Sequence, residues 1–390
     1  MVRNVMLCIV LLVFVYGNGF ADTKVLPRVR VDTSSPRIQL AILLDTSGSM
    51  SGLIDQARTE LWAVVNEFIT VKQNGKAPEL DVALYEYGKS ALPQKEGYIR
   101  KIVGFSNDLD KVSQELFALK TNGGSEYCGW VIQDAVKQLD WSQAANDLKV
   151  IFIAGNEPFT QGPVDYKESC KAAIEKGIIV NTIHCGSLEQ GISGKWKDGA
   201  LVADGSYLCI NHNRKAVEIS APQDAEIVKL SEELNDTYIA YGREGARYKK
   251  NQVAQDRNSS SISISNMAQR AATKSSRYYR NDKWDIVDAM KDGKVKLEEM
   301  ESSELPKEMQ TMDKSEQEKY VAEKAEKRAV IQKKIQKLNA ERKEYIAAEM
   351  KKIAGADKSL GSAIIKAVRK QAESRKFEFQ EVKIETKSEK

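Results

Sequence analysis

Apolar segments alternate with amphipathic segments between residues 37 and 245, and this alternation constrains the fold more than any other feature. Five short runs are nearly continuous in apolar residues, as strands buried on both faces are. They are 38–44, 80–87, 150–154, 178–183 and 207–210. Apolar residues recur at helical spacing in the segments between them, at 54–71, 126–139, 166–176 and 225–241. This order predicts a doubly wound, mostly parallel α/β sheet flanked by helices.

The loop after the first predicted strand carries the most informative motif. Such sheets bind ligands at the carboxyl ends of their strands, and this loop contains Asp45, Ser47 and Ser49 at alternate positions. A tight turn can bring these oxygens together, with Gly48 supplying backbone freedom. Hard oxygen ligands indicate Mg²⁺ or Mn²⁺, and Ca²⁺ also fits. As an alternative, Ser47 or Ser49 only caps the helix that follows.

In this context the motif resembles the start of the metal-ion-dependent adhesion site of the von Willebrand factor A-type (VWA) family. The resemblance covers residues 37–245 and implies a metal site that binds an acidic residue of a protein partner. In that family a second loop adds a hydroxyl, and the matching segment here runs from Thr121 to Glu126. Ser125 is the expected hydroxyl, with Thr121 as the alternative. A serine here also serves as a helix N-cap, which leaves a second role open for Ser125.

The third loop departs from the family pattern. The family places an Asp after its central strand, whereas this chain has Gly155 at that position, followed by Asn156 and Glu157. Three alternatives follow. In the first, Asn156 or Glu157 reaches the ion from a shifted loop. In the second, Asp45 and the hydroxyls hold the ion together with more water molecules. In the third, the site is degenerate and holds no metal, because the number of ligands sets the affinity for hard cations.

No catalytic motif accompanies this site. The sequence has no G-x-S-x-G elbow, no phosphate-binding loop with its Lys and no HExxH motif. His184 follows the fourth apolar run and could act as a base, although a packed, structural histidine is favoured. We therefore expect a binding protein rather than an enzyme.

The composition changes after residue 245. Residues 256–261 are polar and unpatterned, which predicts a linker over 246–283 that includes a helix around 267–279. Residues 284–390 are expected to form a charged helical tail. Residues 307–390 hold 22 basic and 15 acidic side chains, so the chain's net charge of +4 divides into −3 before this segment and +7 within it. Apolar stripes predict helices over 314–353 and 360–372, arranged as a hairpin or a coiled coil that could set the oligomeric state. Mixed charges along the tail argue against nucleic-acid binding.

The first 21 residues are expected to be a signal peptide. Arg3 precedes an apolar run, and small residues at Gly19 and Ala21 match a cleavage site. The run of about 12 apolar residues is too short to cross a membrane, so the mature chain is expected to be exported, either periplasmic or secreted, without a transmembrane segment. Its four cysteines allow a disulfide in that compartment, and Cys185–Cys209 is the favoured pair.

Two functions compete at this stage. The favoured one is an exported, metal-dependent protein-binding module centred on Asp45. The other is a structural or assembly protein that uses the helical tail and carries a vestigial metal site.

Overall fold

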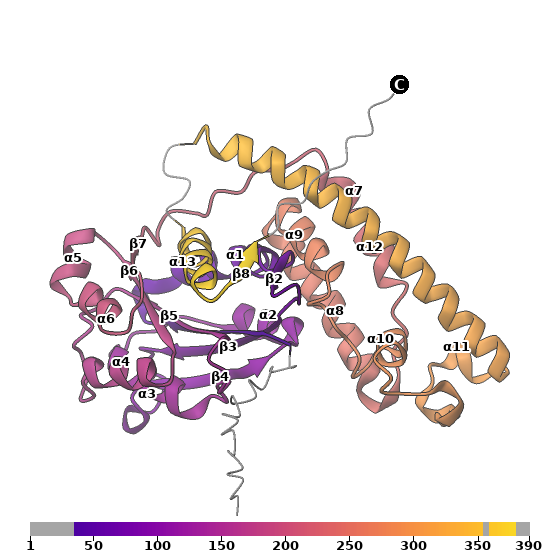
Figure 1. Cartoon of the computed structure of the whole chain (residues 1–390), viewed down its shortest axis with the longest axis horizontal. Coiled ribbons are helices and arrows are strands. Elements are labelled where there is room, and N and C mark those ends of the chain that lie inside the picture. Colours follow the sequence, from indigo (N-terminus) through magenta and orange to yellow (C-terminus); the bar gives the residue numbers. More distant parts are fainter. Residues whose placement is uncertain (1–34, 354–358, 380–390) are drawn as a thin grey trace, which may run out of the picture. The chain divides into compact units, whose positions relative to one another are not determined.

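A six-stranded sheet forms the centre of the described structure, a computed structural model that covers residues 35–353 and 359–379 (Figure 1). The strand order is β4-β3-β1-β5-β6-β7. The strands are β1 (Arg37–Asp45), β3 (Glu79–Tyr87), β4 (Ile99–Ser106), β5 (Leu148–Gly155), β6 (Ile179–Cys185) and β7 (Tyr207–Ile210). Neighbouring strands are parallel except for the antiparallel pair β3–β4. The predicted doubly wound, mostly parallel α/β fold is therefore confirmed.

The edge strand β4 was not anticipated from the sequence. It contains Arg100 and Lys101 next to each other, and both side chains are exposed. An edge strand tolerates such charges because only one of its sides pairs with the sheet. The charges interrupt the apolar run on which the prediction depends.

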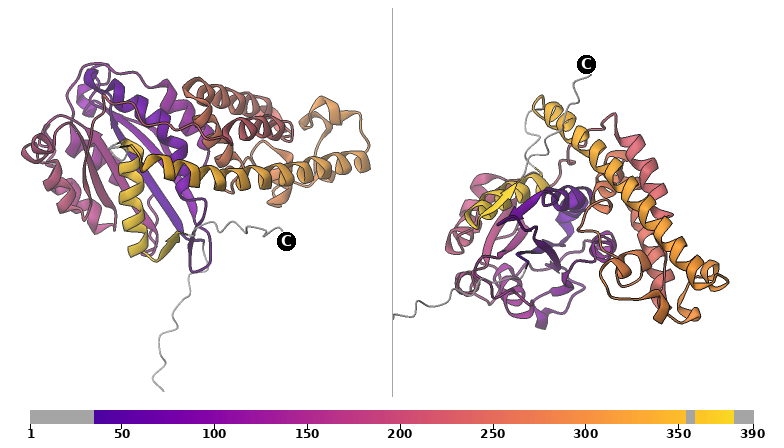
Figure 2. Two further views of the ribbon diagram at one scale, coloured as in Figure 1. Left: turned by 90° about the horizontal axis from the view of Figure 1, so that it is seen from above. Right: turned by 45° about the vertical axis from the view of Figure 1, so that its right-hand side comes forward.

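Helices cover both faces of the sheet, as Figure 2 shows from two further directions. Residues of α1 (Ser51–Glu67), α2 (Leu109–Ala118) and α13 (Leu360–Ser374) share one apolar cluster with the sheet. Residues of α3 (Cys128–Gln138), α4 (Tyr166–Glu175) and α6 (Trp196–Val202) share the cluster on the other face. The short helix α5 (Leu188–Ser193) follows β6. The α/β core therefore has three layers.

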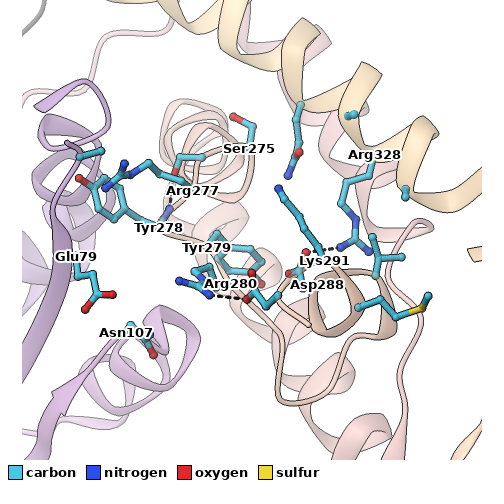
Figure 3. A pocket seen from close by; sticks show the side chains of 18 of the residues that line it. Glu79, Asn107, Ser275, Arg277, Tyr278, Tyr279, Arg280, Asp288, Lys291 and Arg328 are labelled. Atoms are coloured by element: carbon cyan, nitrogen blue, oxygen red, sulfur yellow. Dashed lines mark hydrogen bonds and ion pairs between the residues drawn. The ribbon is translucent and has the colours of Figure 1, made fainter. Parts of the chain in front are cut away.

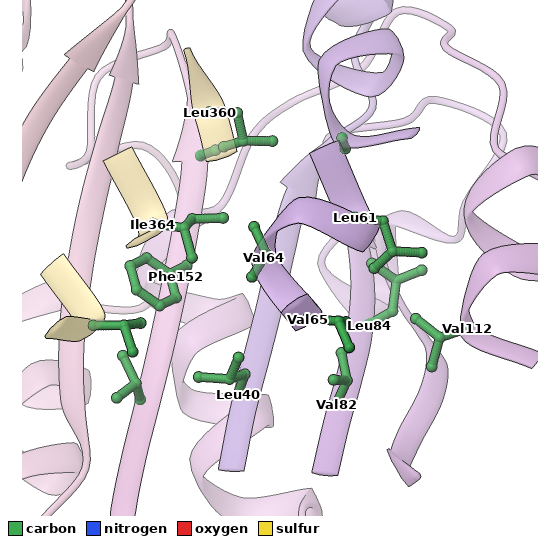
Figure 4. Close-up of a cluster of buried hydrophobic side chains, with 14 of the residues drawn as sticks. Leu40, Leu61, Val64, Val65, Val82, Leu84, Val112, Phe152, Leu360 and Ile364 are labelled. Carbon is green, nitrogen blue, oxygen red and sulfur yellow. The ribbon is translucent and has the colours of Figure 1, made fainter. Parts of the chain in front are cut away.

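The helix α13 is part of this core, although it lies more than 100 residues beyond β7 in the chain. Leu360, Ile364 and Val368 are each at most 3% exposed and pack in the same cluster as α1 and the sheet (Figure 4). The strand β8 (Phe377–Phe379), which follows α13, pairs with β2 (Val71–Gln73). The sequence predicted a separate helical tail for these residues. That expectation is wrong, because the apolar stripe of α13 packs on the sheet.

Residues expected to form a linker are largely helical instead. The helices α8 (Gly242–Ile262) and α9 (Ile264–Lys274) occupy most of 246–283. The helix α9 packs against α1, α8 and α7 (Asp224–Asn235). The polar composition misled the prediction, because several polar side chains are buried and paired. Arg270 is fully buried between Asp110 and Asp256, at 2.7 and 2.6 Å, and Lys274 lies 2.9 Å from Asp256. Ion pairing satisfies these charges inside the protein.

The long helix predicted over 314–353 is present as α12 (Lys314–Met350). It packs across α7 (Asp224–Asn235), α9 and α10 (Ile286–Lys291), and α11 (Lys307–Gln310) precedes it. Arg328 of α12 is buried and lies 2.6 Å from Asp285, and Arg342 lies 2.5 Å from Asp224. The apolar stripe of α12 thus packs against other helices of the same chain. A coiled coil between two copies of the chain stays a prediction.

The predicted disulfide is not formed. Cys128, Cys170, Cys185 and Cys209 are all free thiols. The favoured pair fails for a geometric reason: Cys209 aligns with His184 across the β6–β7 pair, while Cys185 aligns with Ile210. Since successive residues of a strand point to opposite faces, Cys185 and Cys209 lie on different sides of the sheet.

The predicted signal peptide, residues 1–21, lies outside the described residues and stays a prediction. Within residues 35–353 and 359–379, the helices are too short or too polar to cross a membrane.

Candidate metal site

Three loops meet at the carboxyl edge of the sheet. The loop after β1 carries Asp45, Ser47 and Ser49, and the loop before α3 lies against it, because the Asn122 amide donates to the Thr46 carbonyl at 3.0 Å. The loop after β5 joins them, because the Asn156 side-chain amide donates to Ser49 Oγ at 3.4 Å. The sheet topology therefore assembles the region that the sequence predicted.

Asp45 and Ser47 form the buried centre of this region. Asp45 is 1% exposed and Ser47 is 4% exposed. Asp45 Oδ1 accepts a hydrogen bond from the Ser47 amide at 2.7 Å. Within the described residues, Asp45 Oδ2 and Ser47 Oγ are buried without any hydrogen-bond partner. Buried oxygens normally have partners, so this pair marks a place that a bound cation would satisfy.

The helix-capping alternative for the serines is wrong. The helix α1 has Met50 as its N-cap residue, and no side chain caps its first turn. The short 3-10 turn at Gly48–Met50 follows Ser47, and the Ser47 side chain does not cap it. Ser125 does not cap α3 either, because the N-cap residue there is Tyr127. The hydroxyls are thus not used for capping.

The remaining predicted residues lie around this centre at different depths. Ser49 is exposed at the rim, and Ser125, Asn156 and Glu157 are half-buried. Asn156 Oδ1 is a third buried oxygen without a partner in the described part of the chain. Of the two third-loop candidates, Asn156 contacts the first loop through Ser49, whereas Glu157 acts on Asp45 through its charge.

Glu126 also belongs to this site, although the sequence analysis did not select it as a ligand. It is 5% exposed, and the Asp45 charge contributes to its raised pKa. The only sequence signal was its position next to Ser125. Its approach to Asp45 depends on the fold of two loops about 80 residues apart, which no local pattern contains.

Two carboxyl groups of the site have strongly raised pKa values. Burial, opposed by the hydrogen bond from the Ser47 backbone amide, raises the pKa of Asp45 to about 7, and the charge of Glu157 adds to this. Burial, together with the charges of Asp45 and Glu157, raises the pKa of Glu126 to about 7. A divalent cation would reverse this, because a positive charge favours the ionised carboxylates.

The metal-free protein is therefore expected to lose stability as the pH rises from about 4 to about 7. The folded Asp45 retains its proton in this range while the unfolded Asp45 has lost it, so the free energy of unfolding falls by on the order of 3 kcal/mol. Urea unfolding in chelator at several pH values measures this fall. Asp45→Asn, which mimics the protonated group, should flatten the profile relative to wild type; an unchanged profile contradicts the assignment.

The donor set fits a hard divalent cation. It combines carboxylates, hydroxyls and an amide oxygen, which are the ligands that Mg²⁺, Mn²⁺ and Ca²⁺ take. Among the described residues, no group of three or more His, Cys, Asp or Glu side chains is arranged to hold a metal ion. A site here must therefore use the hydroxyls of Ser47 and its neighbours together with the carboxylates.

The two histidines lie near this edge but form no catalytic pair with a nucleophile. His184 is 3% exposed, and neither ring nitrogen has a hydrogen-bond partner in the described structure. Burial lowers the pKa of His184, and the neighbouring His212 lowers it further. The ring of His184 lies 5.7 Å from that of Trp196. Its packed, neutral environment agrees with the structural role favoured from the sequence.

A cavity of about 990 Å³ lies elsewhere, between the amino end of β3, residues 275–280 that follow α9, and the helices α10 and α12 (Figure 3). Its three arginines are already engaged: Arg280 pairs with Asp292 at 2.5 Å, Arg328 pairs with Asp288 at 2.8 Å, and Arg277 donates to the Pro78 carbonyl. Among the described residues, none with a buried, unpartnered oxygen lines this cavity.

Comparison with known proteins gives matches in fold alone. No family model and no curated protein matches the chain. Similar solved structures include proximal thread matrix protein 1 from the mussel byssus (12% identity, 45% of this chain and 42% of that chain, TM-score 0.33). Others are the SpRpn10 VWA domain (16% identity, 45% and 88%, TM-score 0.34) and BatB from Bacteroides thetaiotaomicron (16% identity, 44% and 90%, TM-score 0.34).

The mussel protein has also been solved with zinc in its MIDAS motif (11% identity, 45% of this chain and 41% of that chain, TM-score 0.33). The match spans less than half of that protein's length. The α/β architecture is shown by the six-stranded sheet of this chain, and the binding properties must be argued from its own site.

Proposed function

We propose that the protein is a non-enzymatic, metal-dependent protein-binding module. A divalent cation, Mg²⁺ or Mn²⁺ with Ca²⁺ as a further fit, would be held by Asp45, Ser47, Ser49 and Ser125, with Asn156 beside them. An acidic residue of a partner protein would complete its coordination. The observation that carries this proposal is the pair of buried, unpartnered oxygens, Asp45 Oδ2 and Ser47 Oγ, at the carboxyl edge of the sheet.

The position of the site supports binding of a macromolecule. Asp45 is buried, whereas Ser49 is exposed, so a cation between them would have a protein side and a solvent side. A bound cation supplies positive charge and an open coordination position for an external carboxylate. The residues of this chain orient the cation and exclude water from one side of it.

The alternative, an assembly protein that acts through the helical tail, has less support. The stripe of α12 is occupied by α7, α9 and α10, and α13 is inside the α/β core. Tyr345 and Val330 remain exposed on α12, at 38% and 50%, and an oligomer through this helix would have to use them. Export to the periplasm or the medium, without a nucleic-acid partner, completes the proposal.

The proposal is tested by Asp45→Asn. Isothermal titration with Mn²⁺ should show one site on the wild-type protein and at least about 100-fold weaker binding to the variant, because the central carboxylate is lost. Asp55→Asn is the matched control, since Asp55 is 71% exposed and pairs only with its helical neighbour Arg58. Peptides that carry an Asp or Glu at one varied position should then bind the protein in the presence of Mn²⁺ and not in the presence of a chelator.

Metal binding that survives Asp45→Asn would overturn the metal site. Metal binding without any metal-dependent peptide or protein binding would overturn the partner half of the proposal and leave the site intact.

A further inference from the structure

Two acidic side chains, those of Asp45 and Glu126, lie beside the same small space next to Gly88. We propose that Glu126 is a direct ligand of the divalent cation and supplies the carboxylate that the loop after β5 lacks. This inference rests on the proposed function for the presence of a cation. It adds a ligand outside the expected set and explains how the site works with glycine at position 155.

The loop after β5 has no room for a carboxylate at position 155. A Cβ atom added to Gly155 would lie 2.5 Å from the Tyr87 hydroxyl oxygen and 3.1 Å from Asp45 Oδ2. Tyr87 is fully buried, and its hydroxyl donates to the Ala154 carbonyl at 3.0 Å, so it cannot move aside cheaply. Any side chain at position 155 would displace Tyr87 or Asp45.

A different glycine makes room for Glu126. Gly88 has a positive φ of 80°, and a Cβ atom built there would lie 2.7 Å from Glu126 Cγ and 2.9 Å from Asp45 Oδ1. The side chains of Glu126 and Asp45 therefore flank the same small space, which exists because residue 88 has no side chain. Burial, together with the neighbouring charge of Asp45, raises the pKa of Glu126.

The loop that carries Glu126 is held in place by its own contacts. Asn122 bonds to the Thr46 carbonyl at 3.0 Å, and its Oδ1 accepts from the Ser90 hydroxyl at 2.9 Å. The Glu126 amide donates to Gln161 Oε1. Backbone anchoring on both sides of Ser125 fixes Glu126 beside Asp45 before any ligand arrives.

The charges of the described residues leave this pair uncompensated. Within residues 35–353 and 359–379, no Lys or Arg forms an ion pair with Asp45 or Glu126, although both are at most 5% exposed. Two buried carboxylates without a cation must be partly protonated or must bind one. A divalent cation satisfies both, and unpartnered Asp45 Oδ2 and Ser47 Oγ complete its shell.

The arrangement has a consequence for the partner. Two carboxylates neutralise a divalent cation, so this site should hold the metal without a partner. An acidic residue of the partner would then bind mainly through the open coordination position of the cation, because the cation and its two carboxylates together carry no net charge. Removing the Glu126 charge should weaken metal binding and leave the metal with a larger net charge.

The test is Glu126→Gln in the full-length protein, with Mn²⁺ alone as the probe. We expect Mn²⁺ affinity to fall by about tenfold or more, because one of two anionic ligands becomes neutral. The number of water molecules on bound Mn²⁺, measured by water-proton relaxation or ENDOR, should rise by about one if the amide leaves the shell. A merely structural role for Glu126 would not change hydration of the bound metal.

Asp55→Asn is the matched control. Asp55 is 71% exposed and pairs with Arg58 on α1, so its substitution also removes one negative charge but leaves the site untouched. We expect the Mn²⁺ affinity and hydration of this variant to equal those of wild type. The inference is overturned if Glu126→Gln keeps wild-type affinity and hydration, or if the two variants behave alike. Failure of wild-type protein to bind Mn²⁺ would instead overturn the proposed function itself, and this inference with it.

Discussion

Ending the chain at residue 353 is expected to unfold the α/β domain. The truncation removes α13 and β8, and with them the fully or nearly fully buried side chains of Leu360, Ile364, Val368 and Phe377. Replacing one such residue by Ala typically costs about 2–5 kcal/mol. Losing all of them approaches or exceeds the ~5–15 kcal/mol that stabilises a whole domain.

Polar contacts of α13 would be lost as well. The Glu60 side chain accepts from the Gly361 amide at 2.7 Å, and Gln56 Oε1 accepts from the Leu360 amide at 3.0 Å. Asn181 of β6 and Gln371 of α13 bond to each other inside the core. Truncation would expose both the apolar face of the sheet and these groups to water.

Circular dichroism and urea unfolding measure the effect. A chain ended at residue 379 keeps α13 and β8 and is the control, expected to unfold cooperatively like the full chain. Ile364→Ala gives a folded second variant, with an expected loss of about 2–5 kcal/mol. A cooperative, near-native unfolding transition in the chain ended at 353 would show that α13 is dispensable and contradict the packing in Figure 4.

Arg270→Ala should be the most damaging single substitution in the helical region. Arg270 is 0% exposed, bonds to Asp110 and Asp256, donates to the Gln252 carbonyl at 3.0 Å and lies over the Trp62 ring at 4.8 Å. Its removal leaves Asp110 buried with only the Tyr279 hydroxyl, at 2.6 Å. Breaking a buried ion pair from one side costs about 3–5 kcal/mol.

The control is Arg257→Ala, because Arg257 lies in the neighbouring helix α8 with an exposed side chain. Its substitution should change the free energy of unfolding by no more than about 0.5 kcal/mol. The difference between the two variants in urea measures the buried pair. Equal effects would mean that the Arg270 network contributes nothing beyond a surface charge.

These two predictions concern the same property of the chain. Segments that the sequence predicted to be a tail and a linker stabilise the α/β domain. Arg270 and Asn266 of α9 contact α2 and α1, since Arg270 pairs with Asp110 and Asn266 donates to the Thr59 carbonyl. The part of the chain after residue 245 is therefore attached to the α/β core by buried contacts. An experiment that removes residues 307–390 to separate a tail from a head would remove part of the core.

Only part of the candidate metal site could be predicted from local sequence patterns. The strand before Asp45 and the loop with Ser47 and Ser49 are contiguous in sequence, so their relation to each other could be predicted. The position of Glu126 beside Asp45 could not be predicted, because it depends on the approach of Gly88 and Asp45 from two other loops. The block at Gly155 likewise depends on Tyr87, which belongs to β3 and is separated from β5 in the sheet by β1.

The sequence by itself determined the alternation of strands and helices, the long helix α12 and the oxygen-rich loop at the end of β1. Each depends on residues a few positions apart, where periodicity and turn chemistry act. Only the tertiary structure decided that α13 completes the core, that 246–283 is largely buried helix and that Glu126 lies beside Asp45. Those outcomes come from contacts such as Arg270–Asp110 and Asn181–Gln371, whose partners are 160 and 190 residues apart. A sequence does not distinguish a polar residue that is exposed to water from one of the same type that is buried and paired, because the fold brings its hydrogen-bond or ion-pair partner next to it.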